Sequence, residues 1–224
     1  MNSRMKSAIA AAALAACATS TFAVTDDFNR AAIGASWAIQ AGSMSISANQ
    51  VVGANESLMT YAPGAGSFTA TVDIFNDGLS TQYGAIVLGY LDLGHNAFIK
   101  VQNNGGGAGS FDTYGFYYGN NGGGQFGSIT GLAAFTSARI TATLSGSIAT
   151  LSIDTDFDGI ADKTLTHDYG ALSFGSGVGL GIYGSARLDN FDLGGAGPIP
   201  EPETYALMLL GLAAVGAVAR RRQR

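Results

Sequence analysis

The chain has 224 residues, a formal net charge of −5 at pH 7 and 33 glycines. The charge is unevenly distributed, because all 16 acidic residues lie between Asp26 and Glu203, where only five basic residues occur and the net charge is −11. A surface this acidic repels phosphate backbones, so we expect no nucleic-acid partner. It is compatible with divalent cations and with a hydrated polysaccharide matrix.

The N-terminus has the pattern of a secretory signal peptide. Two basic residues precede an apolar stretch at residues 8–16, and small residues around Phe22 favour cleavage after Ala23. We therefore expect a signal helix at residues 1–23 and export. An alternative stays open, because the residues before Cys17 also match a lipoprotein box. Cys17 is the only cysteine, so cleavage after Ala23 leaves a domain without disulfides that depends on its core for stability.

Residues 24–197 are expected to form one all-β domain. Short apolar or alternating stretches end at glycine-rich turns, and no 3.6-residue apolar period is visible. For example, Ala70, Val72 and Ile74 share one strand face, and the residues between them are polar. We expect strands at residues 68–75, 83–91, 97–102, 139–144, 148–153, 163–169, 178–183 and 187–193. This pattern predicts an antiparallel two-sheet sandwich.

Two motifs at the ends of this domain sharpen the prediction. The sequence DDFNRA at residues 26–31, followed by Trp37, opens the domain, and LDNFDL at residues 188–193 closes it. The pair resembles the first and last strands of concanavalin A-like, or laminin G-like, jelly-roll domains. The resemblance implies a jelly roll with adjacent terminal strands and a carbohydrate-associated role. For Trp37 and Phe191 themselves, core packing is the favoured interpretation.

An aromatic stretch provides a candidate surface for sugars. Tyr114, Phe116 and Tyr118 share one face of an expected strand between two glycine-rich loops. Exposed tyrosines combine an apolar ring, which stacks on sugars, with a hydroxyl group that forms hydrogen bonds. These three residues are therefore a candidate glycan contact. The alternative, which we favour, is that this face belongs to the core.

Alternating aspartates provide a candidate calcium site. They are Asp154, Asp156, Asp158 and Asp162. Calcium prefers several carboxylate oxygens, and Gly159 permits the sharp turn that gathers them. However, Leu165 occupies the twelfth position, where an EF-hand needs a bidentate acid, and strands rather than helices are expected on both sides. An acidic hairpin turn is the alternative.

The sequence does not predict catalysis. Glu56 is the only glutamate before the C-terminal tail, and the Glu-x-Asp-x-x-Glu strand of hydrolases with this fold is absent. No Gly-x-Ser-x-Gly elbow occurs. Neither His95 nor His167 has a His or Cys partner at zinc-ligand spacing. We expect a non-catalytic protein, and a glycoside hydrolase is the least favoured reading.

The C-terminus combines a proline-rich motif, an apolar run and a basic cluster, in that order. The motif is Pro200, Glu201 and Pro202, the apolar run covers residues 204–219, and the cluster at residues 220–224 includes Arg220, Arg221 and Arg222. At ~1.5 Å per residue the run makes a helix of roughly 24 Å, slightly shorter than the ~30 Å hydrocarbon core. We therefore expect a single, temporary transmembrane helix whose arginines stay in the cytoplasm.

This three-part order, at residues 198–224, resembles the PEP-CTERM sorting signal of Gram-negative, biofilm-forming bacteria. The resemblance implies recognition by an exosortase, a membrane transpeptidase that cuts near the PEP motif and passes the protein to the cell surface. An ordinary C-terminal anchor is the alternative.

Together these features predict an exported jelly-roll protein of the cell surface or extracellular matrix. Our leading hypothesis is a structural or adhesive protein, and the alternative is a glycan-binding, lectin-like module. The expected partners are an exosortase and extracellular polysaccharide, and calcium is the one cofactor that the sequence suggests.

Overall fold

The computed structural model describes residues 24–61, 68–76, 81–103, 109–119 and 124–194. These residues belong to a compact unit, Ala23–Gly195. The expected signal peptide, the PEP motif, the apolar run and the arginine cluster lie outside the described residues. Within the described ranges, no helix is long and apolar enough to cross a membrane.

The described residues form 13 strands, and all strand pairs are antiparallel. The strands are β1 (Val24–Asp26), β2 (Trp37–Ser47), β3 (Gln50–Tyr61), β4 (Phe68–Phe75), β5 (Gln82–Asp92), β6 (His95–Asn103), β7 (Thr113–Tyr118), β8 (Gly124–Ser128), β9 (Ser137–Ser145), β10 (Ile148–Asp154), β11 (Lys163–Asp168), β12 (Gly177–Tyr183) and β13 (Arg187–Leu193).

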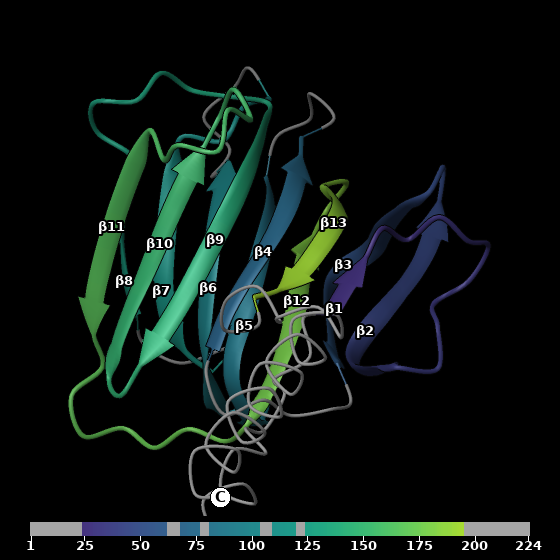
Figure 1. Cartoon of the computed structure of the whole chain (residues 1–224), viewed down its shortest axis with the longest axis horizontal. Helices are drawn as coiled ribbons and strands as arrows, with labels where there is room; N and C mark the ends of the chain where they lie inside the picture. Colours follow the sequence, from purple (N-terminus) through teal and green to yellow (C-terminus); the bar gives the residue numbers. More distant parts are fainter. Residues whose placement is uncertain (1–23, 62–67, 77–80, 104–108, 120–123, 195–224) are drawn as a thin grey trace, which may run out of the picture. The chain divides into compact units, whose positions relative to one another are not determined.

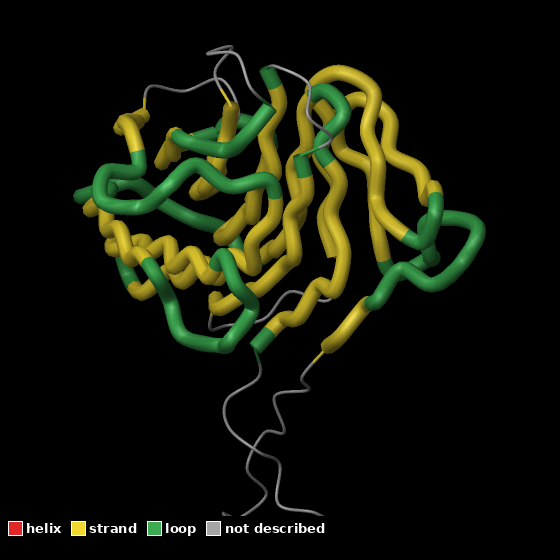
Figure 2. The backbone as a smooth tube through the Cα atoms, turned by 90° about the horizontal axis from the view of Figure 1, so that it is seen from above, coloured by secondary structure: helices red, strands yellow, loops and turns green. Residues whose placement is uncertain are grey.

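The strands form a two-layer jelly-roll-like sandwich (Figure 1). One layer has the order β11-β10-β9-β4-β13, with β1 added beside β13. The other has the order β3-β12-β5-β6-β7-β8, with β2 added beside β3. The two layers join where β13 pairs with β3 at only two positions, Arg187 with Val52 and Leu188 with Val51. Figure 2 shows the same strands from above, end-on and stacked in layers.

Alternating side chains build the core between the layers. In β9 every second residue is buried, which places Ile140, Ala142 and Leu144 on the inner face as the sequence predicts. In β5 both faces are buried: Ile86 and Leu88 point to the core, whereas the residues between them belong to a second apolar cluster. The sheet that contains β5 is therefore apolar on both sides.

The terminal strands lie side by side, as the two end motifs predict. Val24 pairs with Leu193, and Asp26 pairs with Phe191. Trp37 is 6% exposed, and its ring lies 5.0 Å from that of Phe191, so both aromatic residues pack in the core.

The opening motif nevertheless needs a correction, because the first strand already ends at Asp26 and most of residues 26–31 form a loop. Phe28 has a φ of 50° there and is fully buried, so the loop turns sharply to place this ring in the core. Three further strands, β2, β3 and β8, were not expected from the sequence. Small and polar residues dominate β2, and two irregularities in its pairing with β3 break the period-2 pattern.

Candidate functional site

The second apolar cluster forms an aromatic face on the outer side of one sheet. Its buried members are Leu58, Tyr83, Ala85, Val87 and Phe98, and Ala41, Tyr90, Leu93, Tyr117 and Tyr183 pack against them. All of these residues belong to β2, β3, β5, β6, β7 and β12 or to the β5–β6 turn. Within the described part of the chain, no other layer contributes to this cluster. We call it the outer aromatic face.

Tyrosines and one lysine occupy the middle of the outer aromatic face. The rings of Tyr83 and Tyr183, directly paired across β5 and β12, are stacked with centroids 5.6 Å apart. The Lys100 ammonium lies 4.4 Å from the centroid of Tyr83 and 4.6 Å from that of Tyr117. The lysine thus bridges two tyrosines through cation–π contacts.

The charge of Lys100 is not neutralised by direct contact with a carboxylate. No ion pair of Lys100 is found among the described residues. Burial lowers its pKa, and the attraction of nearby Glu56 partly offsets this effect. The Tyr83 hydroxyl donates a 3.2 Å hydrogen bond to Glu56 Oε1, and burial, followed by this carboxylate, raises the pKa of Tyr83 far above its usual value. Tyr83 is therefore a neutral donor that orients Glu56.

A hollow of about 220 Å³ opens beside these residues. Its lining is mostly polar: Glu56, Thr81, Gln82, Tyr83, Lys100, Gln102, Asn103 and Tyr183. Gln102 is 7% exposed and lines the hollow, where its amide can donate to or accept from a polar ligand.

The three aromatic residues of the candidate sugar contact lie elsewhere, on the inner face of β7. Phe116 is fully buried in the core, and Tyr114 and Tyr118 pack against the same core. The Tyr118 hydroxyl donates a 2.6 Å hydrogen bond to the Ser173 carbonyl. Phe116 therefore offers no surface to a ligand. This face of β7 lies against the core, which is the interpretation that the sequence favours. The outward aromatic residue of this strand is Tyr117, which no sequence pattern distinguished from its neighbours.

The aspartate loop connects β10 and β11 as an ordered acidic turn. One carboxylate oxygen each from Asp154, Asp156 and Asp162 lie within 4.8 Å of one another, and Asp158 is not part of this group. Asp154 accepts N–H groups of Phe157 and Gly159, at 2.7 and 3.0 Å. The loop is thus held together by its own backbone hydrogen bonds.

The crowding of carboxylates affects protonation in this loop. A backbone hydrogen bond from Asp158 lowers the pKa of Asp156, but desolvation and repulsion by Asp158 and Asp162 outweigh it, so the net pKa is raised. The hydroxyl and backbone N–H of Thr155 lower the pKa of Asp162. A bound cation would relieve the repulsion at Asp156.

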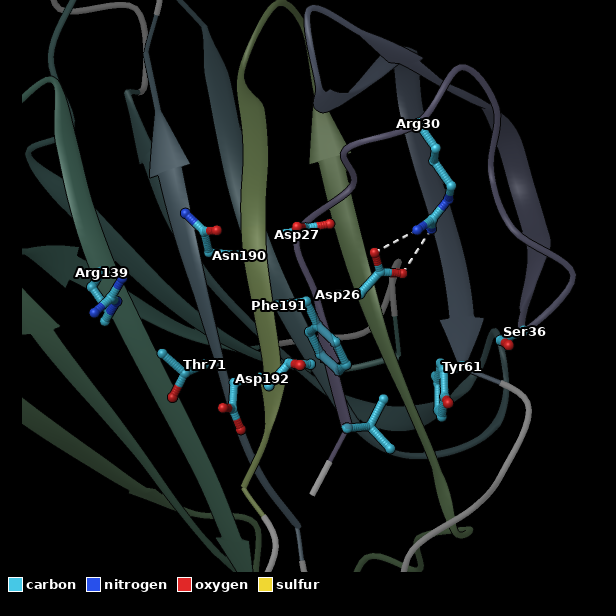
Figure 3. A pocket seen from close by; sticks show the side chains of 12 residues that line it. Asp26, Asp27, Arg30, Ser36, Tyr61, Thr71, Arg139, Asn190, Phe191 and Asp192 are labelled. Atoms are coloured by element: carbon cyan, nitrogen blue, oxygen red, sulfur yellow. Dashed lines mark hydrogen bonds and ion pairs between the residues drawn. The ribbon is translucent and has the colours of Figure 1, made fainter. Parts of the chain in front are cut away.

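A larger hollow of about 670 Å³ lies beside the terminal strands, and Figure 3 shows the residues that line it. Arg30 forms two hydrogen bonds with Asp26, at 2.6 and 2.7 Å, and Trp37 Nε1 donates a third to the same carboxylate at 2.7 Å. Arg139 is likewise bound to Asp73 at 2.7 and 3.0 Å. Both arginines already have a carboxylate partner: the Asp26 contacts hold the first strand to the loop that follows it, and the Arg139–Asp73 pair joins β9 to β4.

Comparison with known proteins assigns the C-terminal segment. Residues 198–223 match the PEP-CTERM protein-sorting motif. None of the curated protein sequences matches this chain.

Solved structures resemble the folded unit. The carbohydrate-binding module CBM66 from Bacillus subtilis superposes with a TM-score of 0.51 at 15% identity, over 71% of this chain and 96% of that chain. Lectin II from Ulex europaeus superposes with a TM-score of 0.51 at 10% identity, over 78% of this chain and 98% of the lectin. The exoplasmic/lumenal domain of VIP36, in a Ca²⁺/Man3GlcNAc-bound form, superposes with a TM-score of 0.52 at 10% identity, over 75% of this chain and 87% of that domain.

At these identities the likeness establishes the fold alone, and the sorting motif implies export and processing by an exosortase. The chain carries a PEP-CTERM protein-sorting motif at its C-terminus, after a folded unit whose jelly-roll fold is similar to that of solved lectins and a carbohydrate-binding module.

Proposed function

We propose that this protein is a non-catalytic, carbohydrate-binding protein that an exosortase delivers to the cell surface or extracellular matrix, where it adheres to polysaccharide. The observation that carries the proposal is the outer aromatic face. Aromatic side chains that no second layer of the described fold covers are typical of a binding surface. The carbohydrate-binding proteins among the similar structures support this choice of ligand.

The same face argues against hydrolysis. Glycoside hydrolases commonly use two carboxyl groups, about 5 Å apart in retaining enzymes and about 6.5–9.5 Å apart in inverting enzymes. Glu56 is the only carboxylate among the residues that line the smaller hollow. The arrangement thus supports binding of a sugar without cleavage of its glycosidic bond.

Calcium at the aspartate loop is a second part of the proposal. Asp154, Asp156 and Asp162 would hold the ion, because their carboxylate oxygens already converge. Calcium takes 6–8 oxygen ligands, so carbonyl groups or waters would supply the others. Asp158 remains a proposed ligand from its position in the sequence, although its Oδ1 accepts the Ile160 N–H at 2.7 Å. In this role the ion would rigidify the turn.

The test uses the processed protein recovered from the surface of the producing cells. We expect it to bind at least one polysaccharide on a glycan array and to release no new reducing ends from that polysaccharide. A folded protein that binds none of the arrayed glycans would contradict the proposed function. Release of reducing ends would instead show an enzyme.

A further inference from the structure

The outer aromatic face contains a row of side chains that crosses four neighbouring strands. Tyr183 on β12 is paired with Tyr83 on β5, and Lys100 on β6 and Tyr117 on β7 continue the row. Three strand spacings of about 4.8 Å give the row a length of about 14 Å. That length suits several linked sugar rings rather than one.

Strand register explains why the row is continuous. Lys100 is paired with Ala85 and Gly115, so it lies diagonal to both Tyr83 and Tyr117, at a separation that long side chains bridge. A Cβ atom on Gly115 would overlap Cε2 of Tyr117. The Tyr117 ring therefore lies against this glycine, beside the Lys100 ammonium.

The members of the row differ in what they offer a ligand. Tyr83 is 7% exposed and lies between Tyr183 and Lys100, so it positions its neighbours. Tyr117 and Tyr183 are only partly buried and present ring surface. The smaller hollow, which Tyr183 and Lys100 help to line, supplies an ammonium group, a carboxylate and the amide of Gln102.

The charges in this hollow favour a neutral ligand. Glu56 lies close enough to Lys100 to affect its pKa, so the two groups largely cancel at longer range. A uronate or sulfate group would also approach against the −11 charge of the segment from Val24 to Glu203. Ammonium, carboxylate and amide groups together donate to and accept from neighbouring hydroxyl groups, which are the polar groups of an uncharged sugar.

We propose that Tyr183, Lys100 and Tyr117 form the contact row for an extended, uncharged polysaccharide, in which sugar rings stack on the tyrosines while Lys100, Glu56 and Gln102 bind hydroxyl groups. This inference rests on the proposed function and adds to it the face, the contacting residues and the class of glycan.

The test compares uncharged polysaccharides (glucan, mannan and galactan) with alginate and polygalacturonate, using the processed protein and isothermal titration calorimetry. We expect binding to an uncharged polymer that changes little between 50 and 500 mM NaCl. Lys100→Met keeps the aliphatic stem but removes the ammonium group. A hydrogen bond to a charged group contributes about 1.5–3 kcal/mol, so affinity should fall roughly 10-fold or more. Tyr183→Ala should weaken binding to a similar extent, since stacking on an aromatic ring is lost.

Two matched controls isolate the row. Lys163→Met removes a cation from edge strand β11, and Phe157→Ala removes an exposed aromatic residue from the aspartate loop. Neither should change the affinity, and all variants should keep the wild-type circular dichroism spectrum and cooperative melting. Lys100→Arg should retain more affinity than Lys100→Met because it keeps the charge.

Several results would overturn the inference. Preference for alginate or polygalacturonate would contradict an uncharged ligand. Unchanged glycan affinity in folded Lys100→Met and Tyr183→Ala proteins would place the binding site elsewhere, although the proposed function would stand. If Tyr183→Ala instead converted a dimer to a monomer in sedimentation without affecting glycan binding, the face would be a self-association surface. Binding to no glycan at all would remove the proposed function as well.

Discussion

At the scale of single residues, Asp26 couples the first strand to the loop that follows it. Its carboxylate accepts two hydrogen bonds from Arg30 and one from Trp37, and it also accepts the Phe28 N–H at 3.0 Å. Burial would raise the pKa of Asp26, but the hydrogen bonds of Arg30, Trp37 and Phe28 outweigh it, and the net pKa is lowered. Asp26 is therefore bound more strongly when ionised than when protonated.

The lowered pKa of Asp26 predicts a pH-dependent contribution to stability. A carboxyl group whose pKa is lower in the folded state stabilises the fold above its unfolded pKa, and this contribution is lost as pH falls through the folded value. Asp26→Asn keeps an acceptor for Trp37 but loses the ion pair. It should reduce the free energy of unfolding at pH 7 by about 1–3 kcal/mol.

Urea denaturation of Asp26→Asn and wild type at pH 7 and in steps below pH 3.8 measures this difference. The difference in free energy of unfolding between wild type and Asp26→Asn should become smaller as pH falls and Asp26 becomes protonated in the wild type. A difference that stays constant over this range would show that the charge of Asp26 contributes nothing. Asp112→Asn is the matched control, since Asp112 is an exposed aspartate outside this hydrogen-bond network.

At the scale of elements, the β10–β11 hairpin contains the aspartate run, which has two interpretations. The strands flank the loop as the sequence predicts, with Ile153 paired to Lys163. The three-carboxylate cluster occurs in the same loop as a network of backbone hydrogen bonds that needs no ion. The hairpin fold is therefore compatible with both a calcium loop and a plain acidic turn.

Thermal unfolding with and without calcium distinguishes these interpretations. Bound calcium would stabilise the native state by ~2.7 kcal/mol at 100 times Kd. For a domain of this size, Tm would rise by about 2–4 °C per kcal/mol. The double variant Asp156→Ala, Asp162→Ala should lose the shift, and magnesium should do little, since it retains its waters. If the wild-type protein has the same Tm in millimolar calcium and in chelator, the loop binds no calcium and is a plain acidic turn.

At the scale of the whole molecule, the folded unit has its two chain ends in one place. Val24 pairs with Leu193, so the chain leaves the jelly roll beside the point where it enters. The outer aromatic face is formed by β2, β3, β5, β6, β7 and β12, whereas β1 and β13 pair along the other layer. The C-terminal segment, which would tether the domain before processing, therefore follows a strand of the layer that does not carry the outer aromatic face.

The sorting motif predicts how that tether is processed. Replacing Arg220, Arg221 and Arg222 with Ala should weaken retention in the membrane and reduce the amount of processed protein, because the positive charges that hold the segment's orientation are lost. Intact-mass analysis of the wild-type surface protein should find neither the arginine cluster nor the apolar run. A mature protein that keeps Arg224 would contradict exosortase processing.

The sequence by itself determined the fold class and the C-terminal sorting motif. Period-2 alternation in residues 68–75 and 139–144 is dictated by which side chains can be buried together, so these strands could be assigned locally. The order of proline motif, apolar run and arginines is also local information, and it matches the sorting motif at residues 198–223. Irregular strands such as β2 escaped prediction, because bulges and small residues erase the alternation.

Only the tertiary structure decided which aromatic residues face outward. Tyr83, Lys100, Tyr117 and Tyr183 come from four strands spread over a hundred residues, and strand pairing alone places them in a row. A strand with apolar residues on both faces does not reveal which face a second layer covers. In β7 this ambiguity left Tyr114, Phe116 and Tyr118 open to both a candidate sugar contact and the favoured core interpretation, and register turns those residues inward and Tyr117 outward.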